Sequence, residues 1–342
     1  MKKYLTGAAV IAGAMMAGAF FAGQASAADK LVIAVVPKNL NNPFFDQAKF
    51  GCEKAVAEIG ADKVECYFTG PGEHGGGDEQ VQIVADLIAK GVDGIAVSPS
   101  NAAAMASVLP AAKEKGIPVL TWDSDLLPDN KDLRLAYIGT YNYDIGVNLA
   151  KAIMAKKPKG GTICIQSGGA AAANHNERMQ GIRDTLAGVT GTTSPGDRLT
   201  GQNGWTEVDG CPLYTDDDFP KAVQQEEDIL GKYPNLDAFV ATGGFAQFLP
   251  DANKSMLEKH KAKIADGSLV VAVADTLSMQ LEQLGEGYST VNVGQRPFEM
   301  GYKVIFAIKD IKEGKPAPAD PTYTGLDVCT QENVKTCVGG GG

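Results

Sequence analysis

Leu31-Val32-Ile33-Ala34-Val35-Val36, followed after a short turn by Asn41-Asn42-Pro43-Phe44-Phe45, is the stretch of sequence that decides the fold. The apolar run is typical of a buried parallel strand, and Pro43 stands where a helix can begin. In open α/β sheets, small molecules bind outside the carboxyl ends of the strands. An amide and two aromatic rings at that point therefore predict a ligand pocket at the end of the first strand.

Short apolar runs alternate with helical segments from this first unit onward, which is the pattern of repeated βαβ units. The first helix carries one apolar stripe, with steps of three or four residues, that ends at Gly60. The stripe consists of Phe45, Ala48, Cys52, Ala55 and Ile59. Further strands are predicted at 64–68, 94–98 and 118–121, and further helices at 81–90 and 102–115.

A second series of the same kind begins after Tyr137-Ile138-Gly139-Thr140. Its predicted strands are 162–166, 238–242, 269–274 and 289–293, and its predicted helices are 145–154, 178–186 and 251–260. Two such series with no long linker between them predict two doubly wound parallel-sheet lobes joined by a hinge. The cleft between such lobes can close around a ligand.

The first 27 residues have the features of a secretory signal peptide. Lys2 and Lys3 precede an apolar run over 5–22, and Gln24-Ala25-Ser26-Ala27 offers a cleavage site after Ala27. An uncleaved membrane anchor is the alternative, because the run approaches the length of a bilayer span. The chain has a net charge of −10, and removal of two lysines makes the mature protein more acidic still. Such a surface repels nucleic acid, so no nucleic-acid partner is expected.

Six cysteines in an exported chain predict disulfides. They stand at positions 52, 66, 164, 211, 329 and 337. Cys52 with Cys66 and Cys329 with Cys337 are the preferred pairs, which leaves Cys164 with Cys211, although sequence alone does not determine the pairing. No spacing resembles a zinc site, and the three histidines are His74, His175 and His260. Neither a metal nor a cofactor is expected.

The glycine-rich segment Gly70-Pro71-Gly72-Glu73-His74-Gly75-Gly76-Gly77 invites comparison with a phosphate-binding loop. Such a loop needs a Gly-Lys-Ser/Thr ending, whereas here Asp78 and Glu79 follow and would repel an anion. A flexible connection from strand to helix is the prediction for this segment.

Five blocks together resemble the periplasmic sugar-binding receptors of ABC importers, in the ribose-binding-like group of type I periplasmic binding proteins. The resemblance covers residues 31–335. The blocks are Asn41-Asn42-Pro43-Phe44-Phe45, Leu87-Ile88-Ala89-Lys90-Gly91-Val92-Asp93-Gly94-Ile95, Pro118-Val119-Leu120-Thr121-Trp122-Asp123-Ser124-Asp125, Glu177-Arg178-Met179-Gln180-Gly181, and Gly294-Gln295-Arg296-Pro297-Phe298-Glu299-Met300-Gly301.

The resemblance implies roles for residues of the first lobe. Asn42 would bind a ring hydroxyl, and Phe44 and Phe45 would pack on the faces of a sugar, although Phe45 also fits the core stripe of its helix. Asp123 would accept hydrogen bonds from two hydroxyls. Trp122 either stacks on the ligand or belongs to the core.

In the second lobe the resemblance implies ligand contacts from Asn174, Asn176 and Arg178, with Asn176 preferred to Arg178 as the counterpart of the family's arginine. Asp275 would accept from another hydroxyl, and Gln295 would touch the ligand from the hinge. The lobes would comprise residues 28–139 plus 296–325 and residues 140–295 plus 326–338, with a glycine tail at 339–342.

The chain also departs from the family's pattern. Ser124 stands where some members place an arginine, so recognition of hydroxyls there should differ. Gly243-Gly244-Phe245 replaces a polar pair and could bring Phe245 or a backbone amide to the pocket. Lys38 could reach the pocket, as it does in the branch that binds a furanose signal, although a solvated lysine is the preferred interpretation.

The expected function is that of a monomeric periplasmic receptor that binds a monosaccharide between its lobes and delivers it to an ABC permease. The alternative is a receptor for a polyol or furanose signal that a chemoreceptor or sensor kinase reads. A glycosidase would need paired carboxylates, and only Asp123 with Asp275 could supply them. Because the resemblance implies that both accept from sugar hydroxyls, and no general acid stands out, no enzyme is expected. A sugar-responsive transcription factor shares the architecture, but the export signal and the absence of a DNA-binding segment argue against it.

Overall fold

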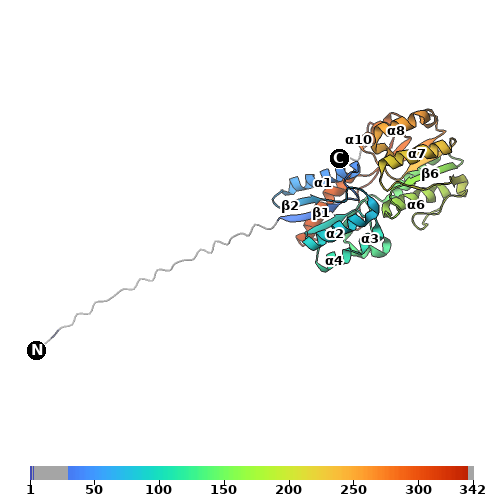
Figure 1. Cartoon of the computed structure of the whole chain (residues 1–342). Helices are drawn as coiled ribbons and strands as arrows, with labels where there is room; N and C mark the ends of the chain where they lie inside the picture. The colour runs from blue at the N-terminus through green and yellow to red at the C-terminus, as the bar shows by residue number, and fades with distance from the viewer. Residues whose placement is uncertain (2, 4–29, 338–342) are drawn as a thin grey trace.

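The computed structural model describes residues 1, 3 and 30–337, which form two α/β lobes side by side (Figure 1). The sheet of the first lobe has the strand order β12-β5-β4-β3-β1-β2, and all its pairings are parallel. Its strands are β1 (Leu31–Val36), β2 (Val64–Phe68), β3 (Gly94–Val97), β4 (Val119–Trp122), β5 (Ala136–Gly139) and β12 (Thr322–Tyr323). Its helices are α1 (Pro43–Ile59), α2 (Asp78–Lys90), α3 (Ala102–Ala106), α4 (Leu109–Glu114) and α11 (Pro297–Lys312).

The second lobe has the equivalent strand order β13-β11-β10-β9-β6-β7, in which β8 also pairs with β6; all its pairings are parallel except that of β13, which runs antiparallel to β11. Its strands are β6 (Gly161–Ser167), β7 (Trp205–Glu207), β8 (Leu213–Tyr214), β9 (Ala238–Ala241), β10 (Val270–Ala274), β11 (Val291–Gly294) and β13 (Asp327–Thr330). Its helices are α5 (Asn142–Lys156), α6 (Ala173–Ala187), α7 (Phe219–Lys232), α8 (Pro250–Leu257), α9 (Lys261–Ala265) and α10 (Ser278–Gly285). The prediction of two doubly wound lobes is confirmed. The exact residue at which each lobe begins and ends stays a prediction.

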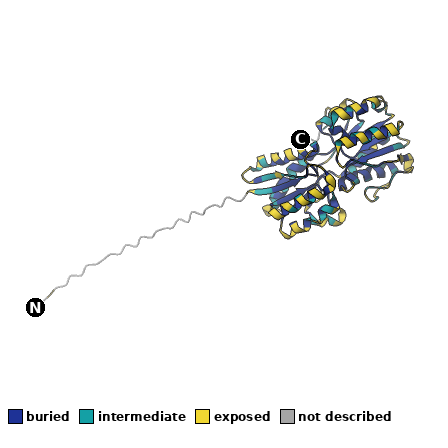
Figure 2. Cartoon of the chain, in the orientation of Figure 1, coloured by how far each residue is buried: buried dark blue, intermediate teal, exposed yellow. Residues whose placement is uncertain are grey.

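Each sheet is covered by helices on both faces, so its strands are buried while the outer faces of the helices are exposed (Figure 2). In the first lobe one core cluster joins the sheet to α1 and α11, and another joins it to α2, α3 and α4. In the second lobe the corresponding clusters involve α5 and α6 on one face and α7, α8 and α9 on the other. This layering leaves the carboxyl ends of the strands free to form a site.

Helix α1 begins as its sequence predicts. Asn42 has an extended backbone and its Oδ1 accepts from the backbone N–H of Phe44 at 3.0 Å, while Pro43 occupies the first helical position. An N-cap asparagine satisfies a donor that would otherwise be unpaired at the helix start. The block that suggests a ligand pocket therefore also starts the helix.

Glycines allow the closest helix pairs to pack backbone against backbone. A Cβ on Gly301 of α11 would lie 1.8 Å from the backbone oxygen of Ala48 in α1, and a Cβ on Gly51 of α1 would lie 1.9 Å from that of Phe298. The second lobe repeats the arrangement, because a Cβ on Gly181 of α6 would lie 2.2 Å from the backbone oxygen of Tyr143 in α5. Two of the five sequence blocks thus contain glycines that helix packing requires.

No prediction was made for helices α9, α10 and α11 or for the short strands β5, β7, β8, β12 and β13. Two further elements differ from what was expected. The single helix predicted over 102–115 is two helices, α3 and α4, with Pro110 in the first turn of α4. Helix α7 was not predicted, because its buried stripe of Ala222, Glu226 and Ile229 is interrupted by a carboxyl group.

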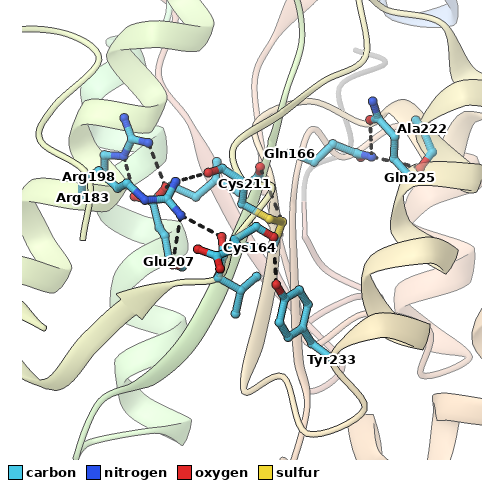
Figure 3. The surroundings of a disulfide bond; sticks show 12 residues. Cys164, Gln166, Arg183, Arg198, Glu207, Cys211, Ala222, Gln225 and Tyr233 are labelled. Carbon is cyan, nitrogen blue, oxygen red and sulfur yellow. Dashed lines mark hydrogen bonds and ion pairs between the residues drawn. A yellow bond between two sulfur atoms is a disulfide. The ribbon is translucent and has the colours of Figure 1, made fainter. Parts of the chain in front are cut away.

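The three predicted disulfides are all formed: Cys52–Cys66, Cys164–Cys211 and Cys329–Cys337. The second of these ties β6 to the loop after β7 (Figure 3). Beside it, the buried carboxylate of Glu207 accepts from Nε of Arg183 at 2.7 Å and from the backbone N–H of Leu199 at 3.1 Å. These contacts fix the start of the segment that leads through β8 to α7.

None of the helices in the described part of the chain is long and apolar enough to cross a membrane. The predicted signal peptide apart from residues 1 and 3, its cleavage site, and the glycine tail at 339–342 lie outside the described residues.

Candidate ligand-binding site between the lobes

A small cavity of about 20 Å³ lies between the lobes at the carboxyl ends of their strands. Residues of both lobes form its walls. Ten of the twelve predicted site residues line it: Lys38, Asn42, Phe44, Phe45, Asp123, Asn174, Arg178, Phe245, Asp275 and Gln295. Five further residues complete the lining: His175, Asp217, Gly243, Gly244 and Phe248.

Asp123 follows β4 and is almost fully buried. Its φ of 56° lies in the left-handed region, which costs energy for a residue with a Cβ and is most often found at functional sites. Ser98 donates to its Oδ2 at 2.7 Å, and Nδ2 of Asn174 lies 3.3 Å from its Oδ1. The hydroxyl of Tyr137 donates to its backbone oxygen at 2.9 Å. These contacts hold the carboxylate at the cavity wall.

Asp275 occupies the equivalent place after β10 of the second lobe, with a φ of 73°. Its Oδ1 accepts from Nε2 of Gln295 at 2.9 Å, and its Oδ2 accepts from the backbone N–H of Gly244 at 3.2 Å. Burial raises the pKa of this carboxyl, while the charge of Arg178 and the Gln295 hydrogen bond act in the opposite direction. The sequence suggested that a backbone amide of Gly243-Gly244-Phe245 could reach the pocket; the amide of Gly244 instead donates to Asp275.

Lys38 is buried, with 1% of its surface exposed, so the preferred interpretation of a solvated lysine is wrong. Its Nζ donates to Oδ1 of Asn174 at 2.8 Å and lies 3.5 Å from Oδ2 of Asp123. The ammonium gains a hydrogen bond and a nearby carboxylate, which offset its loss of hydration. Because Lys38 follows β1 and Asn174 belongs to α6, this hydrogen bond joins the two lobes across the cavity.

Arg178 points from α6 into the cavity and is also almost fully buried. Its Nε donates to Oδ1 of Asn142 at 2.9 Å, and its Nη1 donates to the backbone oxygen of Thr242 at 2.8 Å. The remaining nitrogen, Nη2, lies 3.6 Å from Oδ1 of Asp123. The guanidinium is thus fixed by its own lobe and faces the carboxylate of the other.

Aromatic rings supply the apolar part of the cavity wall. Phe44 and Phe45 come from α1, and Phe245 and Phe248 come from the turn after β9. Phe45 also packs edge-to-face on Trp122, with ring centroids 5.6 Å apart. Phe45 therefore combines the two roles that the sequence left open, lying in the core and on the cavity wall.

Three side chains named as candidates lie elsewhere. Asn176 turns away from the cavity, because its Nδ2 donates to the backbone oxygen of Ala170 at 2.9 Å, and Arg178 takes the position for which Asn176 was preferred. Ser124 is buried but does not line the cavity. Trp122 is a core residue whose Nε1 donates to the backbone oxygen of Ala96 at 3.2 Å.

His175 and Asp217 line the cavity although the sequence analysis did not select them. His175 follows Asn174 at the start of α6, so its nearness to a candidate was the one available signal. Asp217 lies in the loop before α7, a helix that was not predicted, so nothing indicated that this aspartate faces the site.

Several buried polar atoms on the cavity wall have no hydrogen-bond partner among the described residues. They are Nη2 of Arg178, Oδ1 of Asp217 and Oε1 of Gln295. An unpaired buried polar atom is costly, so such atoms are usually satisfied by water or a ligand. One donor and two acceptors, between aromatic walls, match a small molecule that is rich in hydroxyl groups.

The lobes also meet beside the cavity. The backbone N–H of Ala102 donates to the backbone oxygen of Ala171 at 3.2 Å. His74, from the glycine-rich segment, is buried against Gly169, where a Cβ would lie 2.6 Å from the imidazole Cε1. The cavity is thus enclosed by contacts between the lobes.

A sequence profile described as a periplasmic binding protein domain matches residues 33–316. The chain belongs to this family. The D-allose-binding periplasmic protein of Escherichia coli K12 is 26% identical over 333 residues, which cover 93% of this chain and 94% of that protein. A D-ribose/D-allose-binding protein of Pseudomonas aeruginosa is 29% identical over 167 residues, which cover 48% of this chain and 52% of that protein.

A solved structure shows the same arrangement of lobes. An ABC transporter solute binding protein from Burkholderia graminis, in complex with D-arabinose, matches with a TM-score of 0.76 at 30% identity. The match covers 90% of this periplasmic binding protein and 98% of the Burkholderia chain. The fold is therefore that of the type I periplasmic binding proteins.

Proposed function

We propose that this periplasmic binding protein is the receptor of an ABC importer and that it binds one neutral monosaccharide in the cavity between its lobes. The observation that carries the proposal is the cavity wall, where aromatic rings lie beside buried polar atoms that lack partners. Aromatic rings can pack on the C–H faces of a sugar, and its hydroxyls must be paired once they are buried.

The charges on the wall support a neutral ligand. Lys38 and Arg178 lie within 3.6 Å of Asp123, and Asp217 and Asp275 add two further carboxyl groups. A sugar acid or sugar phosphate would bring its negative charge next to these three carboxyl groups, which disfavour it. The proposal accordingly assigns binding of hydroxyls to Asp123, Arg178, Asp275 and Gln295, and of ring faces to Phe44, Phe45 and Phe245.

The named relatives support the rest of the proposal. The Escherichia coli relative is a D-allose-binding protein, the Pseudomonas relative is a D-ribose/D-allose-binding protein, and the Burkholderia solute binding protein is in complex with D-arabinose. We therefore propose a periplasmic location after cleavage at Ala27 and transfer of the sugar to a membrane permease, with no chemical reaction. Reading of the closed form by a chemoreceptor stays a prediction.

A thermal-shift screen tests the proposal. The mature protein, unfolded and refolded to remove bound ligand, is heated with pentoses, hexoses, sugar acids, sugar phosphates and polyols. Ligand at about 1,000 times Kd stabilises a protein by about 4 kcal/mol, so a neutral monosaccharide should raise the melting temperature by several degrees. Stabilisation by sugar acids or phosphates alone, or by no sugar, would contradict it.

A further inference from the structure

His175 and Asp217 form an acceptor pair on the cavity wall. The Nε2 of His175 and Oδ1 of Asp217 are 4.0 Å apart, which is too far for a direct hydrogen bond. Both residues are more than nine-tenths buried, with 3% and 8% of their surfaces exposed. Oδ1 of Asp217 has no partner among the described residues. Two polar atoms of residues that line the cavity therefore lie side by side without satisfying each other.

Backbone contacts hold the segment that carries Asp217 in place beside His175. The Cys164–Cys211 disulfide and the pairing of β8 with β6 place the segment before α7 against the end of β6 (Figure 3). The backbone N–H of Thr215 then donates to the backbone oxygen of Ser167 at 2.9 Å, and Oγ1 of Thr215 accepts from the backbone N–H of Asp217 at 3.1 Å. Asp217 is held in the left-handed region, with a φ of 56°.

Glycine makes room where the two side chains approach each other. A Cβ on Gly168 would lie 2.6 Å from Nε2 of His175 and 2.9 Å from Oδ1 of Asp217. Any other residue at this position would have to displace one of the two side chains. The positions of the His175 and Asp217 side chains thus depend on a glycine at position 168.

The chemical role of His175 follows from its hydrogen bonds. Its Nδ1 lies 3.0 Å from Oγ1 of Thr242, which in turn donates to Oγ of Ser167 at 3.4 Å. We assign the tautomer in which Nδ1 of His175 donates to Thr242, because Thr242 can then donate to Ser167 and both hydroxyls are paired; Nε2 is left as an acceptor. Burial, reinforced by the charges of Lys38, Arg178 and His74, holds the pKa of His175 well below its usual value. The imidazole therefore stays neutral.

We infer that His175 and Asp217 determine specificity by accepting hydrogen bonds from two adjacent hydroxyls of the sugar, one hydroxyl to each residue. Two acceptors side by side need two donors, and one hydroxyl has a single hydrogen to donate. Neighbouring ring hydroxyls are close enough together for each to reach one acceptor. The ligand class is thereby narrowed to neutral sugars with a vicinal diol on the face that meets the second lobe. This inference rests on the proposed function.

The test compares Asp217→Asn with Asp216→Asn by calorimetric titration. Asparagine tolerates the left-handed backbone, so Asp217→Asn changes the acceptor and leaves the loop intact. Asp216 is the matched control, because its φ of 55° lies in the same left-handed region but its side chain is 52% exposed and pairs with Lys221. The probes are D-allose, D-ribose and D-arabinose, with the monodeoxy analogues of whichever binds.

We expect the parent sugar to bind Asp217→Asn about 10- to 100-fold more weakly than wild type, because a charge-assisted hydrogen bond is lost. Asp216→Asn should bind as wild type does. In wild type, removal of either of two adjacent hydroxyls should weaken binding by a similar factor. In Asp217→Asn, removal of the hydroxyl that faces position 217 should have little further effect.

The deoxy series on wild type needs no substitution, so it tests the inference even if a variant fails to fold. His175→Gln serves as the second variant and should become insensitive to loss of the other hydroxyl. If both variants bind the sugar with wild-type affinity, or if the deoxy series shows no adjacent pair of hydroxyls that contribute to binding, the inference is overturned while the proposed function stands. Failure of every sugar to bind wild type would instead overturn the proposed function on which it rests.

Discussion

Two aspartates at equivalent places in the two lobes define the site at the scale of single residues. Asp123 after β4 and Asp275 after β10 both adopt positive φ, at 56° and 73°. Such conformations cost about 1 kcal/mol or more each and persist only where neighbours enforce them. The neighbours here are donors to each carboxyl group, so the conformation serves to aim an acceptor into the cavity.

The sequence identified these residues to different degrees. Asp123 and Asp275 follow apolar runs within recognisable patterns, so their place at the end of a strand could be predicted. Lys38 could not be placed, because a lysine becomes buried only when partners distant in sequence, here Asn174 and Asp123, compensate its charge. Asp217 carried no signal because it depends on a loop whose course is fixed by tertiary contacts.

Glu226 leads to a prediction about pH and stability. It is buried in α7 with no partner for its Oε1, and burial raises its pKa from 4.5 to about 8. The folded state therefore holds the proton more tightly than the unfolded state. The resulting stability is fully present below the unfolded pKa and is lost as the pH rises through about 8. We expect Glu226→Gln to melt at least about 2 °C above wild type at about pH 9, and close to wild type at about pH 5.

Differential scanning calorimetry at the two pH values makes this measurement. Burial lowers the pKa values of His74 and His175, so these histidines destabilise the fold as the pH falls. Because they are present in both proteins, comparing the variant with wild type at the same pH cancels their effect. Glu114→Gln is the control, because Glu114 is exposed. An equal effect of Glu226→Gln at both pH values would show that the carboxyl does not titrate as described.

At the scale of elements, periodicity predicted eight strands and six helical segments, but it gave no prediction for α9, α10 and α11 or for the short strands β5, β7, β8, β12 and β13. It failed for α7, whose apolar stripe includes Glu226, and for the division of 102–115 into α3 and α4. Both failures arise where tertiary packing overrides a local pattern. The close approach of Gly51 to α11 and of Gly301 to α1 could not be predicted either, because these positions are far apart along the chain.

Gly301→Ala tests the close packing of α1 against α11. The added methyl group would lie 1.8 Å from the backbone oxygen of Ala48, so the helices must separate. We expect a loss of about 1–3 kcal/mol in the free energy of unfolding, measured by chemical denaturation. Gly231→Ala in α7 is the control: a Cβ there meets nothing within 4 Å, and alanine should be neutral or slightly stabilising. Equal stability of both variants would refute the packing argument.

At the scale of the whole molecule, the site exists only because the lobes meet. Lys38 with Asn174, Ala102 with Ala171, and His74 with Gly169 all join one lobe to the other around the cavity. The chain crosses between the two sheets after β5, after β11 and between β12 and β13. Contacts of this kind favour a closed state, and a ligand that touches both lobes would add to it.

Small-angle X-ray scattering of the ligand-free mature protein, titrated with D-allose, D-ribose and D-arabinose, tests the central claim most directly. The account predicts that one or more of these sugars lowers the radius of gyration in a saturable way. It also predicts that Asp123→Ala, which removes a buried acceptor from the cavity, abolishes the change while keeping the radius of the ligand-free protein. A sugar that binds without compaction, or that compacts Asp123→Ala as readily as wild type, would contradict the claim that the lobes close over a sugar at this site.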